Sequence, residues 1–175
     1  MERNDVSAKW KTSLSVATLV TGIAFWHYLY MSKMFLTGNG SPLALRYVDW
    51  LITVPLQIVE FYLILAAVTV VSRSLFWQLL GASLVMLLGG FVGEACDGWA
   101  MPGFIVGMAG WLYVLYLIFM GEASNINSSS GNEASQKAFN ALRFIVLIGW
   151  SIYPIGYYVN MSCLLYTSPS PRDER

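Results

Sequence analysis

Five long apolar segments, separated by short polar connections, set the pattern of this chain. They cover residues 12–31, 44–71, 75–95, 102–121 and 138–159. Each is close to the roughly 20 residues with which an α-helix crosses the hydrocarbon core of a bilayer. The longest connection, EASNINSSSGNEASQK at residues 122–137, is rich in Ser, Asn and Gly and predicts a polar loop. The pattern therefore predicts an all-α membrane protein with five spans.

The composition agrees with helices that face lipid. Hydrophobic residues make up 57% of the chain and charged residues 11%, against roughly 25% charged residues in soluble domains. The net charge is zero, and no basic cluster suggests a nucleic-acid partner. The single His and the isolated Cys96 and Cys163 do not make a metal site. No Walker loop, GxSxG or HExxH motif indicates an enzyme.

The distribution of Lys and Arg indicates an orientation in the membrane. If the chain starts on the inside, the inner segments carry Arg3, Lys9, Lys11, Arg73 and Lys137. The outer connections carry Lys33, with Arg46 at the mouth of the second span. Positive residues concentrate on the inner side of membrane proteins, so an inside start is favoured. In that frame Asp49 lies toward the outer half of the second span and Glu60 toward the inner half.

The second span carries two acids at two depths. Asp49 and Glu60 are about three helical turns apart, so they lie within roughly 20° of one face and ~16 Å apart along the axis. Ionisable residues inside a span are costly and mark functional sites by default. Two stacked carboxylates suit a proton path with one group near the middle of the membrane and one nearer a surface. The alternative is a buried polar patch that only joins helices.

Other polar side chains share the face of this acidic pair. Arg46 precedes Asp49 by three residues, so its guanidinium should favour an ionised Asp49. Thr53 follows Asp49 by four residues and can offer it a hydroxyl, and Gln57 places a neutral amide between the acids. His27, in the first span, is either a packed interfacial residue or a group that tunes a carboxylate on a neighbouring helix.

The remaining spans place large rings beside small residues. Met86 and Gly90 share a face of the third span, and Trp111 lies in the fourth. In the fifth, a single face carries Trp150, Tyr153 and Pro154. Each group alone is typical of ordinary helix packing, in which Gly allows close approach. Together they could form the walls around a flat, elongated apolar ligand.

Three segments resemble the proteorhodopsins, bacterial light-driven proton pumps of the microbial rhodopsin family. RYVDWLITVPLQIVEFYLILAA at 46–67 is similar to the third helix of that family, TGIAFWHYLYM at 21–31 to the second, and GWSIYPIGY at 149–157 to the sixth. The resemblance covers about residues 5–160. It implies that the five spans correspond to helices two to six of a seven-helix bundle, with the first and seventh helices missing.

The resemblance also implies roles for the acidic pair and its neighbours. Asp49 would be the counterion of the protonated retinal Schiff base and the primary proton acceptor, and Glu60 would be the internal proton donor. Arg46 would belong to the counterion complex. His27 would hydrogen-bond Asp49, within the chain or across a subunit contact, and tune it.

The same resemblance implies a pocket for all-trans retinal. Gln57 matches a colour-tuning position, where glutamine resembles the blue-absorbing variants. The pocket would be lined by Trp50, Thr53, Gln57, Met86, Gly90, Trp111, Trp150, Tyr153 and Pro154. In the family, a lysine of the seventh helix binds retinal. The lysines of this chain are Lys9, Lys11, Lys33 and Lys137, none in the middle of a span, so the attachment lysine is expected to be absent.

The end of the chain departs from the family pattern. After about Asn160 it continues as MSCLLYTSPSPRDER, so residues 161–175 are expected to be a non-native tail. Three interpretations follow. The first is a light-driven outward proton pump present as a fragment, since an acid at residue 60 is typical of pumps and Asp49 favours protons over chloride. The others are a retinal photosensor and a non-photoactive membrane fragment, the latter favoured by the missing lysine.

The resemblance further implies a setting for the parent protein. It would be a multi-pass protein of the bacterial inner (plasma) membrane, with retinal, protons and lipid as partners. Members of the family form pentamers or hexamers, so a homo-oligomer is expected.

Overall fold

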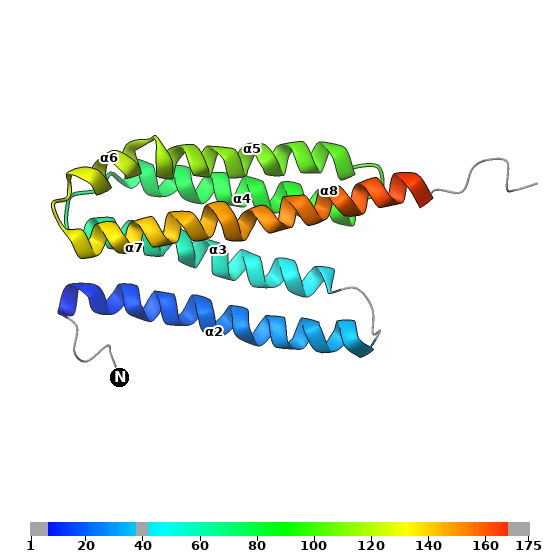
Figure 1. The fold of residues 1–175 in the computed structure, drawn as a ribbon, viewed down its shortest axis with the longest axis horizontal. Helices are drawn as coiled ribbons and strands as arrows, with labels where there is room; N and C mark the ends of the chain where they lie inside the picture. Colours follow the sequence, from blue (N-terminus) through cyan, green and yellow to red (C-terminus); the bar gives the residue numbers. More distant parts are fainter. Residues whose placement is uncertain (1–6, 38–41, 168–175) are drawn as a thin grey trace, which may run out of the picture.

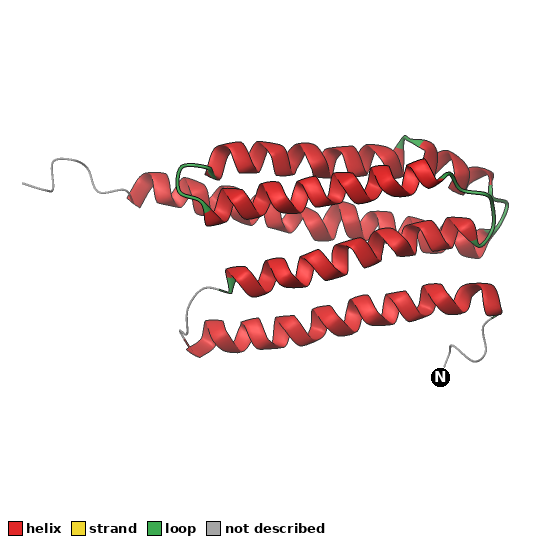
Figure 2. Cartoon of the chain, turned by 180° about the vertical axis from the view of Figure 1, so that it is seen from behind, coloured by secondary structure: helices red, strands yellow, loops and turns green. Residues whose placement is uncertain are grey.

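The computed structural model describes residues 7–37 and 42–167, and these form a bundle of helices joined by short connections. Consecutive long helices run in opposite directions (Figure 1). Seen from behind, α2 and α3 lie side by side at one edge of the bundle (Figure 2). The elements are α2 (Ala8–Thr37), α3 (Leu43–Ala66), α4 (Arg73–Ala95), α5 (Ala100–Phe119), α6 (Glu122–Ser129), α7 (Glu133–Phe144), the π-helix η1 (Ile145–Gly149) and α8 (Trp150–Thr167).

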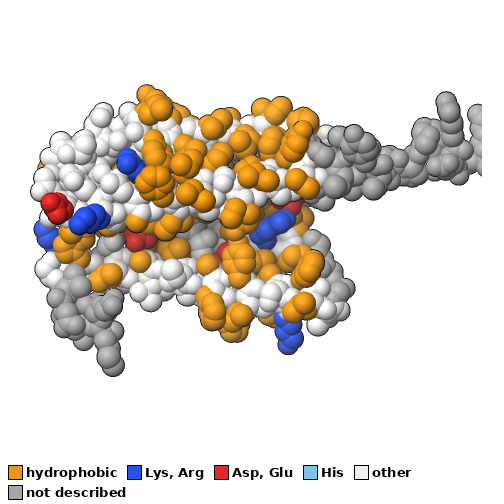
Figure 3. Space-filling model, in the orientation of Figure 1, with side chains coloured by type: hydrophobic (Ala, Val, Ile, Leu, Met, Phe, Trp, Pro, Cys, Tyr) orange, Lys and Arg blue, Asp and Glu red, His pale blue; other side chains and the backbone are white. Residues whose placement is uncertain are grey.

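Five helical stretches in the described part of the chain are long and apolar enough to cross a membrane. They are Ala8–Thr37, Leu43–Ala66, Arg73–Ala95, Ala100–Ser129 and Glu133–Val159. On the face of the bundle shown in Figure 3, apolar side chains are widely spread, with few charges among them. The predicted all-helical, membrane-type fold with five apolar helices is confirmed.

One predicted span is longer than the helix that it describes. The apolar run at 44–71 predicted a helix to its end, but α3 ends at Ala66 and the chain turns before α4. Ser72 begins α4 as its N-cap, because its hydroxyl accepts a hydrogen bond of 3.2 Å from the backbone N–H of Leu75. A prediction from hydrophobicity alone therefore extended the second span across the turn that separates α3 from α4.

The polar loop predicted at residues 122–137 is wrong, because α6 and the start of α7 occupy it. Glu122 lies in the first turn of α6, where the helix dipole favours a carboxylate. Asn132 caps α7, its side-chain oxygen accepting a hydrogen bond of 2.9 Å from the Ser135 N–H. The Gln136 amide donates to the Asn127 carbonyl, 3.1 Å away, and ties α7 back to α6. These polar residues therefore cap the helices and connect α7 to α6.

The tightest side-chain packing lies at the end of the bundle that carries α6 and the α3–α4 connection. This end is called the inner end here, after the orientation predicted from Lys and Arg. Phe61 of α3 and Phe139 of α7 are fully buried, with ring centroids 5.3 Å apart and edge to face. Ile58, Val114 and Ile118 are equally inaccessible to solvent. This apolar core holds α3, α5 and α7 together.

Helices α4 and α5 pack backbone against backbone through glycines. A Cβ added to Gly103 would lie 2.5 Å from the Cα of Gly93, and one added to Gly89 would lie 2.8 Å from the backbone N of Gly107. A Cβ on Gly110 would lie 2.8 Å from the Ala82 carbonyl oxygen. Small residues allow such close approach between membrane helices. The α4–α5 pair depends on the absence of side chains at these positions.

The last helical stretch changes its winding near its middle. A π-helical segment, η1, separates α7 from α8, and Pro154 lies inside α8. A π-helical turn accommodates an extra residue and often lies at a functional site. The backbone of α8 extends to Thr167, into the segment predicted to be a non-native tail. The rest of that segment, residues 168–175, lies outside the described residues.

Candidate functional site

A cavity of about 310 Å³ lies among α2, α3, α4, α5, η1 and α8. The structure brings together around it all the residues predicted to line a ligand pocket. They are Trp50, Thr53, Gln57, Met86, Gly90, Trp111, Trp150, Tyr153 and Pro154. Asp49 also lies in its wall, whereas none of the lysines of the chain does. The cavity is therefore mainly aromatic and apolar, with one buried carboxylate.

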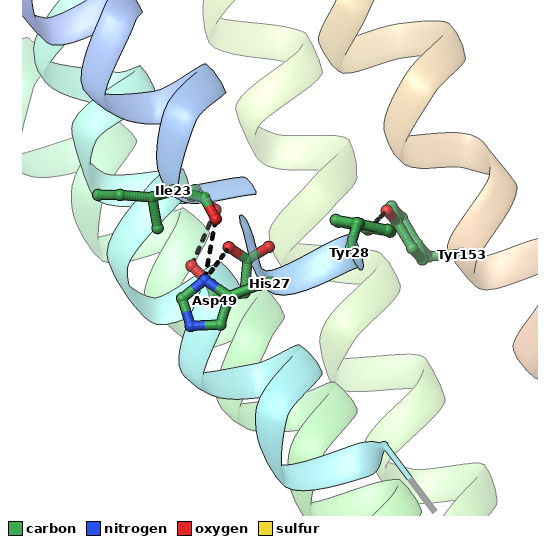
Figure 4. Close-up of polar contacts among 6 residues, drawn as sticks. Ile23, His27, Tyr28, Asp49 and Tyr153 are labelled. Atoms are coloured by element: carbon green, nitrogen blue, oxygen red, sulfur yellow. Dashed lines mark hydrogen bonds and ion pairs between the residues drawn. The ribbon is translucent and has the colours of Figure 1, made fainter. Parts of the chain in front are cut away.

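The aromatic walls are fixed by contacts between helices. Trp50 of α3 packs edge to face on Tyr153 of α8, with ring centroids 4.4 Å apart. The hydroxyls of Tyr28 and Tyr153 are in hydrogen-bond contact, which links α2 to α8 (Figure 4). Trp111 of α5 donates its indole N–H to the carbonyl of Val146 in η1, 3.4 Å away. The π-helix thus provides the acceptor that orients one wall of the cavity.

Asp49 is the most deeply buried ionisable group near the cavity, with 1% of its side chain exposed. Its Oδ1 lies 3.1 Å from Nδ1 of His27 on α2 (Figure 4). The same His27 nitrogen lies 3.0 Å from the Ile23 carbonyl oxygen one turn earlier. Both the carboxylate oxygen and this carbonyl oxygen therefore lie close to one ring nitrogen. The predicted contact between His27 and Asp49 exists within one chain.

Thr53 and Arg46, the two polar neighbours of Asp49 on the same face of α3, make contacts with groups other than its carboxylate. The Thr53 hydroxyl donates to the backbone carbonyl of Asp49, 2.9 Å away, because a threonine in a helix reaches the carbonyl four residues earlier. Arg46 does not pair with Asp49 but with Glu94 of α4. Its guanidinium lies over the ring of Trp50, 5.4 Å from the centroid.

Glu94 is the acid that the sequence analysis missed. It ends the third span, beside a Gly/Pro-marked turn, and an acid at the end of a helix is not unusual in itself. In the structure it accepts hydrogen bonds from Arg46 and from the Tyr47 hydroxyl, the latter 2.9 Å long. Glu94 also lies in the wall of the cavity. Only the packing of α3 on α4 reveals this pairing.

Glu60 lies apart from this group. It is partly buried on α3, does not line the cavity, and makes no hydrogen bond or ion pair with any described residue. Its chain neighbour Phe61 is fully buried in the apolar core. The structure therefore separates the two acids of α3 into a polar and an apolar environment.

A helical bundle of apolar spans, with an aromatic cavity and a buried carboxylate in its wall, agrees with a family match over almost the whole chain. The model of the family described as bacteriorhodopsin-like protein matches residues 1–169. The chain belongs to this family. The match includes residues 161–169, part of the segment predicted to be a non-native tail.

Within the family, the chain is similar to proteorhodopsins. It is 56% identical over 157 residues to a blue-light absorbing proteorhodopsin of Gamma-proteobacterium Hot 75m4, covering 90% of this chain and 62% of that protein. It is 52% identical over 158 residues to a green-light absorbing proteorhodopsin of Gamma-proteobacterium EBAC31A08, covering 90% and 63%. The chain thus spans somewhat over three-fifths of the length of these relatives.

Solved structures give the same result. The crystal structure of blue light-absorbing proteorhodopsin from Med12 matches with a TM-score of 0.72 at 56% identity, covering 89% of this chain and 68% of that one. Exiguobacterium sibiricum rhodopsin matches with a TM-score of 0.79 at 32% identity, covering 90% and 70%. The arrangement of the five spans is that of a microbial rhodopsin.

Proposed function

We propose that this chain is part of a retinal-dependent, light-driven pump that moves protons outward across the bacterial inner membrane. The observation that carries the proposal is the buried carboxylate of Asp49 in the wall of an aromatic cavity, with His27 3.1 Å from it. A photosensor needs the cavity, but it needs no second acid at another depth of the same helix. Asp49 and Glu60 together favour transport.

The residues of the cavity fit retinal. The cavity volume of about 310 Å³ falls at the lower end of the range typical of small-ligand sites, roughly 300–1,000 Å³. Trp50, Trp111 and Trp150 offer flat apolar surfaces to an elongated polyene. Gly90 leaves room where a side chain would project into the cavity wall. Gln57 adds one polar group, which we propose tunes absorption toward the blue.

The attachment point of retinal lies, in this proposal, outside the given sequence. The lysines of the chain, Lys9, Lys11, Lys33 and Lys137, do not line the cavity. The five spans would be helices two to six of a seven-helix bundle, and the lysine would belong to the seventh. The same placement of the lysines favours a second candidate, in which this chain by itself is a membrane fragment without photoactivity.

In the proposed mechanism the two acids of α3 act in sequence. Bound retinal supplies the absorption of visible light and the change of shape that starts each cycle. Asp49, held by His27 in a nearly water-free site, takes a proton from the cavity side and later gives it to the outer side. Glu60, which has no polar partner among the described residues, holds a proton and returns one to the cavity from the inner side. Net transport is outward.

The setting follows from the same resemblance and from the charge distribution. We propose a multi-pass protein with its N-terminal side inside, because Lys and Arg concentrate on that side. A homo-oligomer, pentameric or hexameric, is proposed by similarity to the family.

Complementation with the missing segment tests this proposal. The chain is expressed in bacteria together with the lysine-bearing seventh helix of the blue-light absorbing relative, and all-trans retinal is supplied. We expect a visible absorption band and light-driven acidification of the medium, with the acidification lost in Asp49→Asn. The matched control is Glu122→Gln, which removes an acid at the inner surface. If no acidification occurs although the band forms, the pump assignment is wrong.

A further inference from the structure

Arg143 of α7 carries a positive charge at the inner end of the bundle, and the proposed proton path does not involve it. Its guanidinium lies 4.9 Å from the ring centroid of Phe119 and 5.9 Å from that of Phe144. The two rings pack edge to face, with centroids 6.1 Å apart. Phe119 is the last residue of α5, which ends where α6 and α7 lie (Figure 1). Cation–π contacts therefore hold this guanidinium between α5 and α7, at the level where α5 ends.

No acid balances the charge of Arg143 in the part of the chain that the structure describes. Two acids at the inner end have other partners. Glu122 accepts a hydrogen bond of 2.8 Å from the Ser72 hydroxyl, and Glu133 lies 3.9 Å from the Lys137 ammonium group. Nε of Arg143 is buried and has no hydrogen-bond partner among the described residues. The guanidinium therefore has a full charge and N–H donors to offer to a partner outside these residues.

A second unmatched polar atom lies one turn away on the same face of α7. Asn140 precedes Arg143 by three residues, and its Oδ1 is also buried without a hydrogen-bond partner among the described residues. Buried polar atoms of proteins are nearly always satisfied by the protein, by ordered water or by a ligand. Two unmatched atoms in successive turns therefore indicate that this face of α7 contacts a polar group that is not part of the described chain.

The surface between Arg143 and the middle of the span is apolar and exposed. Phe144 and, about one turn further on, Ile148 are exposed on α7 and η1. On α5, Tyr116 lies one turn before Phe119 and is exposed as well. Both helical stretches are long and apolar enough to cross a membrane, so these side chains face acyl chains. A molecule with an anionic head and an apolar tail is complementary to this surface, with the charge at the end of the span and hydrocarbon beyond it.

We propose that Arg143 binds the phosphate of an anionic phospholipid, whose acyl chains lie along Phe144, Ile148 and Tyr116. A guanidinium presents parallel N–H donors that bind two phosphate oxygens at once, which an ammonium group cannot do. The lipid belongs to the leaflet at the inner end of the bundle, where basic pockets between helices typically bind anionic headgroups. Its phosphate balances a charge that is otherwise costly at the edge of an apolar span.

Competition between labelled lipids tests this proposal without retinal. The full chain is placed in phosphatidylcholine vesicles that contain a trace of spin-labelled phosphatidylglycerol or of spin-labelled phosphatidylcholine. The motionally restricted fraction of each label gives its relative affinity for the protein. We expect wild type to prefer phosphatidylglycerol and Arg143→Gln to lower this preference about fivefold, the usual contribution of one arginine near an anionic membrane surface.

Arg73→Gln is the matched control. Arg73 begins α4, also at the inner end, and its side chain is exposed, so the variant removes the same charge from an open surface. It should change the preference less than about twofold, and this change should vanish in high salt, because exposed charges are screened. The effect of Arg143→Gln should persist there. Equal effects of the two variants would overturn the site, since they would reflect general attraction to the membrane.

Two further measurements define the ligand. Arg143→Lys keeps the charge but not the planar pair of donors, so it should lose most of the preference that Arg143→Gln loses; full retention would contradict the phosphate geometry. Circular dichroism of each variant checks that the helices are intact. Glycerol phosphate in solution should not displace the labelled phosphatidylglycerol, because it lacks acyl chains. Displacement would assign the site to a soluble phosphate and overturn the lipid proposal.

Discussion

The two ends of α3 hold one acid each, in opposite kinds of surroundings. Asp49 lies among polar groups of α2 and α3 beside a cavity, with the ion pair of Arg46 and Glu94 one turn away. Glu60 lies beside a dense apolar core and has no polar partner among the described residues. A carboxylate that must receive and pass on a proton benefits from neighbours that respond to its charge. A carboxyl that must keep its proton benefits from their absence.

The largest effect is expected from removing the acid at the polar end. Asp49→Asn keeps the shape of a side chain that is 1% exposed but removes its charge. Light-driven acidification by the complemented protein should fall at least ~100-fold, the usual size of a lost proton-transfer group. The absorption band should move to the red. Acidification and visible spectra measure both, and a variant that still pumps at a tenth of the normal rate would show that another group accepts the proton.

The apolar end should dominate the stability of the bundle. Phe61→Ala removes a fully buried ring from the core and should cost about 3–5 kcal/mol of unfolding free energy. The matched control is Phe25→Ala on α2, where the ring is 68% exposed and the cost should stay within about 0.5 kcal/mol. Unfolding in detergent mixtures, followed by circular dichroism, compares the two. Equal losses would mean that the core is not concentrated at the inner end.

Glu60→Gln separates the roles of the two acids. The colour should hardly change, because Glu60 does not line the cavity. Recovery of the retinal-loaded protein after a flash should slow by about 10²-fold, since no group returns the proton efficiently. A small weak acid in the buffer should restore the rate, because it can carry protons to the same place. Recovery at the normal rate without that acid would remove Glu60 from the donor role.

The smallest effect in this series concerns the spacing at the polar end. Gly90→Ala would press a Cβ against the Tyr47 hydroxyl, 2.9 Å away, and should destabilise the protein by about 1–2 kcal/mol. Adding Tyr47→Phe should recover most of this loss. Gly22→Ala is the control, because a Cβ there meets nothing within 4 Å. A loss in Gly90→Ala that Tyr47→Phe does not relieve would point to contacts other than Tyr47.

The sequence predicted what depends on composition and local spacing. The five apolar helices and the residues around the cavity follow from hydrophobic runs, from helical periodicity and from a family resemblance. The helices at 122–137 were not predicted, because Ser and Asn favour both loops and caps. Whether such a Ser or Asn lies in a loop or caps a helix depends on the local backbone conformation.

Contacts between helices could be predicted from the sequence less well than contacts within a helix. The spacing of Arg46 and Asp49 allowed an ion pair, but Glu94, distant in sequence, takes the guanidinium. The π-helix η1 has no marker in its sequence, IVLIG, and its effect on Trp111 appears only in the folded bundle. Helical spacing limits which residues can be in contact, and the packing between helices determines which of these contacts form.

The glycines between α4 and α5 restrict which sequences can occupy this pair of helices. Every substitution of a glycine adds at least a Cβ, and at Gly89, Gly103 and Gly110 that atom would fall 2.5–2.8 Å from the backbone of the facing helix. No conservative replacement exists at these positions, unlike at a buried leucine or isoleucine. Selection should therefore remove random substitutions more often at these glycines than in the apolar core. A survey of functional variants would find these positions nearly invariant, although none of them carries a proton or a ligand group.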